Sequence, residues 1–270
     1  MTYRDRIAVV TGAGSGIGRE LTLGLTRGGA TVAAADIDPE GLAATQEMCS
    51  NGQVSTYQLD VADRQAVLDF AGKVRADLGP ASMVFNNAGV DVMASIADTS
   101  WADLDWLTGI NIGGVVNGTK AFLPQLIESG SPARPARLVN LSSAFGLLGM
   151  PLQGAYCMSK FAVRGFTETL RQELIMERHP VTAHCVHPGV VRTNFGANAR
   201  TEDAEFVKLF DRVARTTPTK AAQIILRGVE KNRARILIGA DGWISAAIPR
   251  LLGASYSGLL GRGARLGNRG

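Results

Sequence analysis

Apolar and polar positions along this chain follow two alternating patterns. Short apolar runs are separated by longer segments in which apolar residues recur at helical spacing. The short runs predict strands near residues 6–11, 30–36, 53–59, 82–87, 136–142, 181–187 and 234–239, with helices between them. Such β/α alternation predicts an α/β fold, a single doubly wound parallel sheet with helices on both faces. The reactive cleft is then expected at the carboxyl ends of the strands, where the strand order reverses.

Length and composition agree with one large domain in a reducing compartment. The chain has 270 residues, of which 46% are hydrophobic, and it shows no internal repeat or low-complexity linker. Its three cysteines have no disulfide or metal spacing, and the three histidines lack the partners of a metal site. MTYRDR has no apolar signal core, and no run reaches the ~18 apolar residues of a membrane-spanning helix. We therefore expect a cytoplasmic protein without a bound metal.

A glycine-rich turn follows the first predicted strand. Glycines at positions 12, 14, 16 and 18 of GAGSGIG let the backbone approach a ligand closely, and the next helix presents an N-terminus suited to a pyrophosphate. The spacing is T-G-x-x-x-G-x-G rather than the usual dinucleotide fingerprint, so a simple tight turn is the alternative interpretation. The motif G-K-[ST] is missing, which argues against a phosphate-transferring P-loop.

Asp36 ends the second predicted strand. A carboxylate there can accept hydrogen bonds from both hydroxyls of an adenosine ribose and would repel a 2′-phosphate. Ser15 in the glycine-rich turn adds no positive charge. The pattern favours NAD over NADP, the alternative being a surface acid at the end of a strand.

Tyr156 and Lys160 are spaced to share one face of a helix, just downstream of the serine pair Ser142 and Ser143. A neighbouring cation favours the ionised phenol, so this Tyr is expected to exchange protons nearer neutrality than a free one. The alternative is a half-buried Tyr beside a solvated Lys.

Together these motifs resemble the short-chain dehydrogenase/reductase family. The resemblance rests on TGAGSGIG (11–18), Asp60 in QLDV, NNAG (86–89), Asn111 in INIGG, Ser143, Tyr156, Lys160 and HPGVVRT (187–193), in order and at matching spacing. It spans roughly residues 5 to 240. It implies a Rossmann-fold dehydrogenase domain over residues 1–240, with an integrated active site and a C-terminal extension over residues 241–270.

The resemblance also implies a role for each matched residue. Ser143 would hydrogen-bond the substrate oxygen, Tyr156 would act as general acid or base, and Lys160 would lower the Tyr pKa and hold the nicotinamide ribose. Asn111 would anchor a water in the proton path. The implied cofactor-binding residues are Gly12, Ser15, Gly16, Ile17, Gly18, Asp36, Asp60, Val61, Asn86, Asn87, Ala88, Gly89, Tyr156, Lys160, Pro188, Gly189, Val191 and Thr193. Taken singly, some have structural interpretations, such as Asp60 as a helix N-cap.

The expected function is that of an NAD-dependent oxidoreductase interconverting a secondary alcohol and a ketone. An apolar substrate is indicated by the segment after Thr193, which contains Phe195, Phe206, Leu209 and Phe210. The alternatives are an NADP-dependent carbonyl reductase and a catalytically silent, dinucleotide-binding regulatory protein. Because all four catalytic positions are intact, the sequence favours an enzyme.

The C-terminal extension carries much of the basic bias. The net charge is +4, and Arg250, Arg262, Arg265 and Arg269 lie in this segment among apolar residues. It could cover the pocket, contact another subunit or lie on a membrane surface. No aromatic platform supports nucleic-acid binding. The resemblance implies a homodimer or homotetramer, formed through the helices of residues 101–128 and of the Tyr156 segment.

Overall fold

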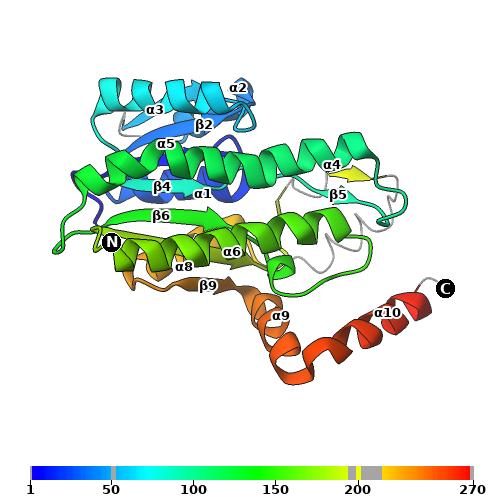
Figure 1. Cartoon of the computed structure of the whole chain (residues 1–270). Helices are drawn as coiled ribbons and strands as arrows, with labels where there is room; N and C mark the ends of the chain where they lie inside the picture. Colours follow the sequence, from blue (N-terminus) through cyan, green and yellow to red (C-terminus); the bar gives the residue numbers. More distant parts are fainter. Residues whose placement is uncertain (1, 50–52, 194–198, 202–214, 268–270) are drawn as a thin grey trace.

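A seven-stranded parallel sheet forms the centre of the protein (Figure 1). The computed structural model describes residues 2–49, 53–193, 199–201 and 215–267. The strand order is β3-β2-β1-β4-β6-β7-β9. The strands of this sheet are β1 (Ile7–Thr11), β2 (Thr31–Asp36), β3 (Val54–Gln58), β4 (Met83–Asn86), β6 (Ala136–Leu141), β7 (Val181–Pro188) and β9 (Arg235–Ile238). The seven predicted strands and the predicted fold class are thus confirmed.

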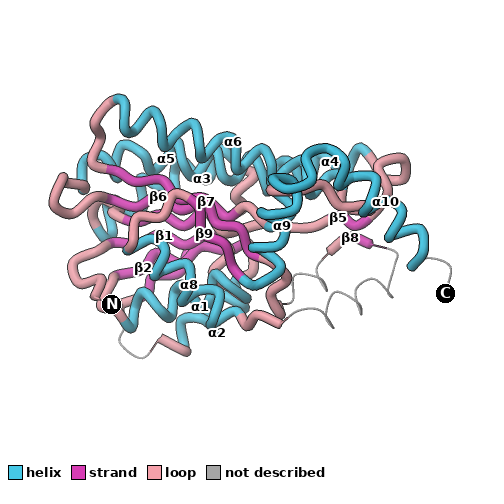
Figure 2. Tube along the Cα trace, turned by 90° about the horizontal axis from the view of Figure 1, so that it is seen from below, coloured by secondary structure: helices cyan, strands magenta, loops and turns pink. Residues whose placement is uncertain are grey.

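Helices cover both faces of the sheet, as Figure 2 shows. Helices α1, α2 and α8 pack on one face, and α3, α5 and α6 on the other. The helices of the main body are α1 (Gly16–Arg27), α2 (Pro39–Glu47), α3 (Arg64–Leu78), α4 (Trp101–Thr108), α5 (Gly114–Ser129), α6 (Gly154–Met176) and α8 (Pro218–Glu230), with the π-helix η1 (Gly109–Gly113) and the 3-10 helix η2 (Ala144–Gly146).

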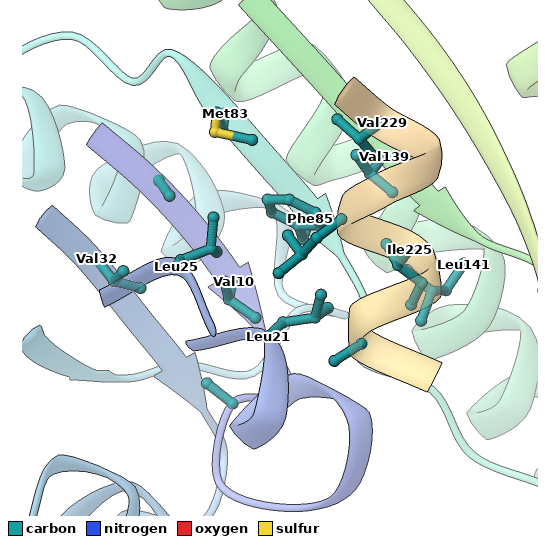
Figure 3. Close-up of a cluster of buried hydrophobic side chains, with 14 of the residues drawn as sticks. Val10, Leu21, Leu25, Val32, Met83, Phe85, Val139, Leu141, Ile225 and Val229 are labelled. Atoms are coloured by element: carbon teal, nitrogen blue, oxygen red, sulfur yellow. The ribbon is translucent and has the colours of Figure 1, made fainter. Parts of the chain in front are cut away.

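Burial on both faces explains why the strands are apolar at successive positions. In β1, Ala8, Val9 and Val10 are all fully buried. Val10 belongs to the cluster under α1 and α8, where Phe85 and Ile225 also lie (Figure 3). Val9 belongs to the cluster on the opposite face. A continuous apolar run is therefore what a central parallel strand requires.

The strand order reverses between β1 and β4. The chain moves from β1 outward to β2 and β3, then returns to β4 on the other side of β1 and continues to β6. At such a switch point the loops after the two strands diverge and leave a crevice. The glycine-rich turn follows β1 and the NNAG segment follows β4, so both lie at this crevice.

The C-terminal segment forms α9 (Gly239–Leu252), the 3-10 helix η3 (Gly253–Ser255) and α10 (Tyr256–Gly267). Helix α9 begins before the expected boundary at residues 240 and 241, and α10 extends away from the body (Figure 1). A separate two-stranded sheet pairs β5 (Val92–Met93) with β8 (Arg200–Thr201). Among the described helices, none combines the length and apolar character needed to cross a bilayer.

Candidate active site

A cleft of about 680 Å³ opens at the carboxyl ends of the central strands. Its walls include Asp36 and Asp60 toward one end and Ser143, Tyr156 and Lys160 toward the other. Every residue expected to bind the cofactor lines this cleft, apart from Gly18 and Asn86. The volume is in the range of small-molecule and cofactor sites.

Two glycines in the turn after β1 have no room for a side chain. Gly12 has a φ of +66°, and a Cβ there would lie 2.9 Å from the Cα of Ala88. A Cβ on Gly18 would lie only 2.0 Å from the carbonyl oxygen of Gly12. Gly18 therefore allows α1 to pack against the turn and does not itself face the cleft. The bare backbone of Gly12 at the cleft surface fits a site that admits a pyrophosphate closely.

Thr11 and Asn87 join the two loops of the crevice. The Thr11 Oγ1 accepts hydrogen bonds from the backbone N–H groups of Asn87 (3.0 Å) and Ala88 (3.1 Å). The Asn87 Nδ2 donates to the carbonyl oxygen of Thr11 at 2.8 Å. The glycine-rich turn and the NNAG segment are thereby fixed relative to each other.

Asn86 has a structural position rather than one on the cleft. Its Nδ2 donates to the Oδ1 of Asn140 at 2.8 Å and to the Oγ1 of Thr119 at 3.2 Å, deep between β4, β6 and α5. Asn140 in turn donates to the Oγ1 of Thr167 at 3.0 Å. This buried polar chain ties the sheet to α5 and α6, and Asn86 has no contact with the cleft.

Asp36 is held in place at the end of β2. Its Oδ2 accepts from the backbone N–H of Gly14 at 2.8 Å, and its Oδ1 accepts from that of Asp38 at 3.1 Å. The exposed Ile37 follows it on the cleft wall. Arg19 is close by, but its guanidinium is bonded to the carbonyl oxygens of Gly14 and Gly41, and it does not line the cleft. Asp36 and Asp60 are thus the charged side chains at this end of the described cleft wall, and both are acidic.

Asp60 is not the N-cap of α3. That position belongs to Asp63, whose Oδ1 accepts from the backbone N–H of Ala66 at 3.0 Å. Asp60 and Val61 line the cleft instead, and the Val61 carbonyl oxygen is fixed by the Nδ2 of Asn117 at 3.1 Å. The interpretation of Asp60 as a helix cap is therefore wrong.

Ser143, Tyr156 and Lys160 converge at the other end of the cleft. Ser143 ends the loop after β6, and the other two lie in the first turns of α6. The Ser143 and Tyr156 side chains share a hydrogen bond. The Lys160 Nζ lies 5.4 Å from the centre of the Tyr156 ring and donates to the carbonyl oxygen of Leu141 at 3.2 Å. The predicted helical face thus brings the phenol and the ammonium into one cleft.

Asn111 lies behind this group, in the π-helix between α4 and α5. Its Nδ2 donates to the carbonyl oxygen of Val90 and to the Oγ of Ser159, and its Oδ1 accepts from the Val90 N–H at 2.9 Å. A Cβ on Gly89 would lie 3.1 Å from the Asn111 Oδ1 and 3.2 Å from the Lys160 Nζ. Asn111 does not line the cleft. Gly89, which has no side chain, lies between the Asn111 amide and the Lys160 ammonium. Single-turn π-helices often mark functional sites.

Burial dominates the electrostatics of the catalytic group. It raises the pKa of the Tyr156 phenol well above its usual value, the charge of Asp91 raises it further, and only the Ser143 hydrogen bond opposes this. Burial also lowers the pKa of Lys160 to about 8, partly offset by Asp91. In the protein without a bound dinucleotide, burial therefore favours the protonated phenol. The main cause is desolvation of the phenolate by burial.

His187 and Ser142 support the catalytic residues from beneath. The Nδ1 of His187 donates to the carbonyl oxygen of Ser143 at 2.9 Å, because a carbonyl oxygen can only accept. Burial lowers the pKa of this imidazole to about 4. The Ser142 Oγ donates to the carbonyl oxygen of Lys160 at 2.8 Å. His187 therefore positions the serine. Within the described residues no group of His, Cys, Asp and Glu could hold a metal ion.

Three polar residues of the cleft were not predicted from the sequence. Asp91 lines the cleft, almost completely buried, and burial raises the pKa of its carboxyl to about 6. Asp241 and Ser245 also line it, from the start of α9. The Asp241 Oδ2 accepts from the backbone N–H of Val190 at 2.5 Å and so fixes the loop after β7. No sequence motif marks these residues, because each contact joins distant segments. Phe195, Phe206, Leu209 and Phe210 lie outside the described residues.

Comparison with known proteins agrees with this geometry. The family model described as short chain dehydrogenase matches residues 6–204. The chain belongs to the short-chain dehydrogenase family. It is 43% identical over 269 residues to SadH of Mycobacterium tuberculosis, a protein named as an oxidoreductase, covering 97% of this chain and 96% of the relative.

Solved structures of the family carry either dinucleotide. The chain resembles a short-chain dehydrogenase from Burkholderia phymatum in complex with NAD, with a TM-score of 0.82, 27% identity, and 88% and 90% of the two chains covered. It also resembles an alcohol dehydrogenase from Thermococcus sibiricus complexed with 5-hydroxy-NADP, with a TM-score of 0.72, 25% identity, and 86% and 93% covered. The protein is thus an oxidoreductase of a family that uses NAD or NADP and acts on small molecules.

Proposed function

We propose that this protein is an NAD-dependent oxidoreductase that interconverts a secondary alcohol and a ketone on an apolar substrate. Asp36 carries the choice of NAD. Its carboxylate is fixed by two backbone N–H groups at the cleft wall. No Lys or Arg lines this end of the described cleft, since Lys160 lies at the catalytic end. Such an end suits two ribose hydroxyls and opposes a 2′-phosphate.

The catalytic residues support proton transfer at a single oxygen. A substrate oxygen placed beside Ser143 and Tyr156 would accept or donate hydrogen bonds with both, and Tyr156 would exchange the proton with it. A dinucleotide held in the cleft would accept the hydride in its oxidised form and donate it in its reduced form. Lys160 and, beyond Gly89, Asn111 provide the polar route along which the phenol regains or loses its proton. The apolar side chains of Val90, Phe145 and Met150, which also line the cleft, support an apolar substrate.

Steady-state kinetics with a panel of secondary alcohols and both dinucleotides tests the proposal. We expect alcohol-dependent reduction of NAD, with a kcat/KM at least about tenfold above that for NADP. The Asp36 carboxylate and a 2′-phosphate about 4 Å apart would repel by ~4 kcal/mol, and half of this repulsion already gives more than a tenfold ratio. Activity with NADP alone would instead identify a carbonyl reductase. Binding of NAD without turnover on any alcohol or ketone would identify a regulatory protein.

We also propose assembly into a homodimer or homotetramer, in the cytoplasm. Helix α6 has an exposed apolar surface that includes Met158 and Phe161, exposed by 46% and 40%. An interface through α5 and α6 would bury it. Light scattering should give a mass above the 28.5 kDa of one chain. A measured mass equal to that of one chain would refute the assembly.

The three cysteines are free, which suits a reducing compartment such as the cytoplasm.

A further inference from the structure

The positive charge of this protein is concentrated at its C-terminal end. Residues 242–270 contain four arginines and no Asp, Glu or Lys. The other 24 basic residues and all 24 acidic residues therefore lie in residues 1–241, which have no net charge. A neutral body thus carries a cationic C-terminal segment, and that segment is suited to a negatively charged partner.

The same segment exposes large apolar side chains. On α9, Trp243 and Leu251 are exposed by 61% and 81%, and helical spacing places them on one side. On α10, Leu259 is exposed by 57%, whereas Tyr256 and Leu260 are half-buried. Helix α10 extends away from the body (Figure 1). Its Tyr256 hydroxyl accepts a hydrogen bond from the Gly149 N–H at 3.1 Å.

A cationic groove lies where α9 leaves the edge of the sheet. It has a volume of about 340 Å³ and is lined by Arg233, Arg235, Leu237, Trp243, Ala246 and Arg250. Arg235 forms an ion pair with Glu168. Arg233 and Arg250 have no acidic partner in the described part of the chain. Two unpaired guanidinium groups beside a tryptophan form a site suited to a phosphate attached to an apolar group.

We propose that α9 and α10 dock this protein onto an anionic phospholipid surface, with a lipid phosphate in the groove of Arg233 and Arg250. Trp243, Leu251 and Leu259 would enter the interfacial layer, as apolar side chains of surface-bound amphipathic helices do, and Trp favours that layer. The arginines would add attraction to the anionic headgroups.

Charge favours a lipid surface over a second copy of the chain. In a two-fold interface both subunits contribute the same surface. An interface through α9 and α10 would therefore bring the cationic segments of the two subunits together. The body of another copy has no net charge to offer in compensation. An anionic bilayer, unlike a second copy of the chain, offers both negative charge to the arginines and an apolar layer to the exposed side chains.

Vesicle co-sedimentation of the full chain tests the inference. It does not rest on the proposed function, because neither alcohol nor dinucleotide is present. We expect binding to phosphatidylcholine vesicles that contain phosphatidylglycerol, weakened by salt, and far less to phosphatidylcholine alone. Arg233→Gln with Arg250→Gln should weaken binding about thirtyfold, taking ~1 kcal/mol per arginine, which is about fivefold each. Arg27→Gln with Arg64→Gln, two exposed arginines of the body, is the matched control.

A second pair of variants tests the apolar contribution. Trp243→Ala with Leu251→Ala should also weaken binding, whereas Trp101→Ala, an exposed tryptophan on α4, should not. Circular dichroism melts confirm that each variant is folded. Equal binding to both kinds of vesicle, or unchanged binding in both test variants, would overturn the proposal. So would a change of oligomeric state in Trp243→Ala with Leu251→Ala without any vesicle binding. Saturable binding of inorganic phosphate to the groove, with no binding to vesicles, would assign it to a soluble phosphate compound instead.

Discussion

Exchange of the charge at Asp36 should change the preferred dinucleotide. The carboxylate is held by the N–H groups of Gly14 and Asp38, so it cannot turn away from a ligand in the cleft. Two like charges about 4 Å apart repel by roughly 4 kcal/mol at an effective dielectric of ~20. Because Asp36 is only partly buried, we take about half of this, a preference for NAD of more than tenfold.

Asp36→Ala with Ile37→Arg removes this repulsion and supplies a guanidinium, since Ile37 is 64% exposed on the same wall. We expect kcat/KM for NADP to approach or exceed that for NAD. Ile37→Arg alone separates the added cation from the lost repulsion, and Asp36→Asn tests charge at nearly constant shape. The assay is paired steady-state kinetics with one alcohol. Equal or better use of NADP by the unmodified protein would refute the assignment of Asp36 to the ribose.

Three further predictions concern the catalytic residues and their support. Tyr156→Phe should abolish turnover with nearly unchanged NAD binding, and retention of more than about a tenth of kcat would exclude Tyr156 as the acid or base, since ~10² to 10⁴ is usual. Lys160→Ala should weaken NAD binding and shift the acidic limb of the pH–rate profile for alcohol oxidation to higher pH, because the phenolate loses its cation; an unaltered profile with normal affinity would contradict this. Burial lowers the pKa of His187 from 6.5 to about 4. The contribution of this residue to the free energy of unfolding should therefore be fully present above pH 6.5 and be lost as the pH falls to about 4, a loss of about 3 kcal/mol. His187→Asn should reduce the pH dependence of the free energy of unfolding in urea, while the buried His184, whose pKa is also lowered to about 4, keeps part of it; an unchanged pH dependence would refute the contribution of His187.

The strands were predictable because each central strand is buried on both faces. That burial leaves a continuous apolar run, as in IAVVT, and the run can be recognised without knowing its neighbours. The α9 boundary was not predictable in the same way. Helix α9 begins at Gly239, directly after β9, and its first turn completes the cleft through Asp241. Only the folded chain shows that the extension belongs partly to the site.

For the candidate site, motifs indicated positions but not the direction of each side chain. Asn86 and Asn87 are adjacent, yet Asn86 points between β4 and β6 while Asn87 faces the cleft. Successive side chains at the end of a strand point to opposite sides, so one motif supplies one structural and one cleft residue. The raised pKa of Tyr156 could not be predicted from the sequence either, because it depends on burial by tertiary packing and on the charge of Asp91, which no motif marks.

The most direct test of the central claim follows the hydride. A secondary alcohol carrying deuterium on its carbinol carbon is incubated with NAD and the purified protein, and the reduced dinucleotide is analysed by mass spectrometry. We predict one deuterium in the NADH formed by the unmodified protein, and no NADH from Tyr156→Phe, although that variant still binds NAD. The claim would be contradicted if no alcohol in the panel yields deuterated NADH, or if Tyr156→Phe forms it at the unmodified rate.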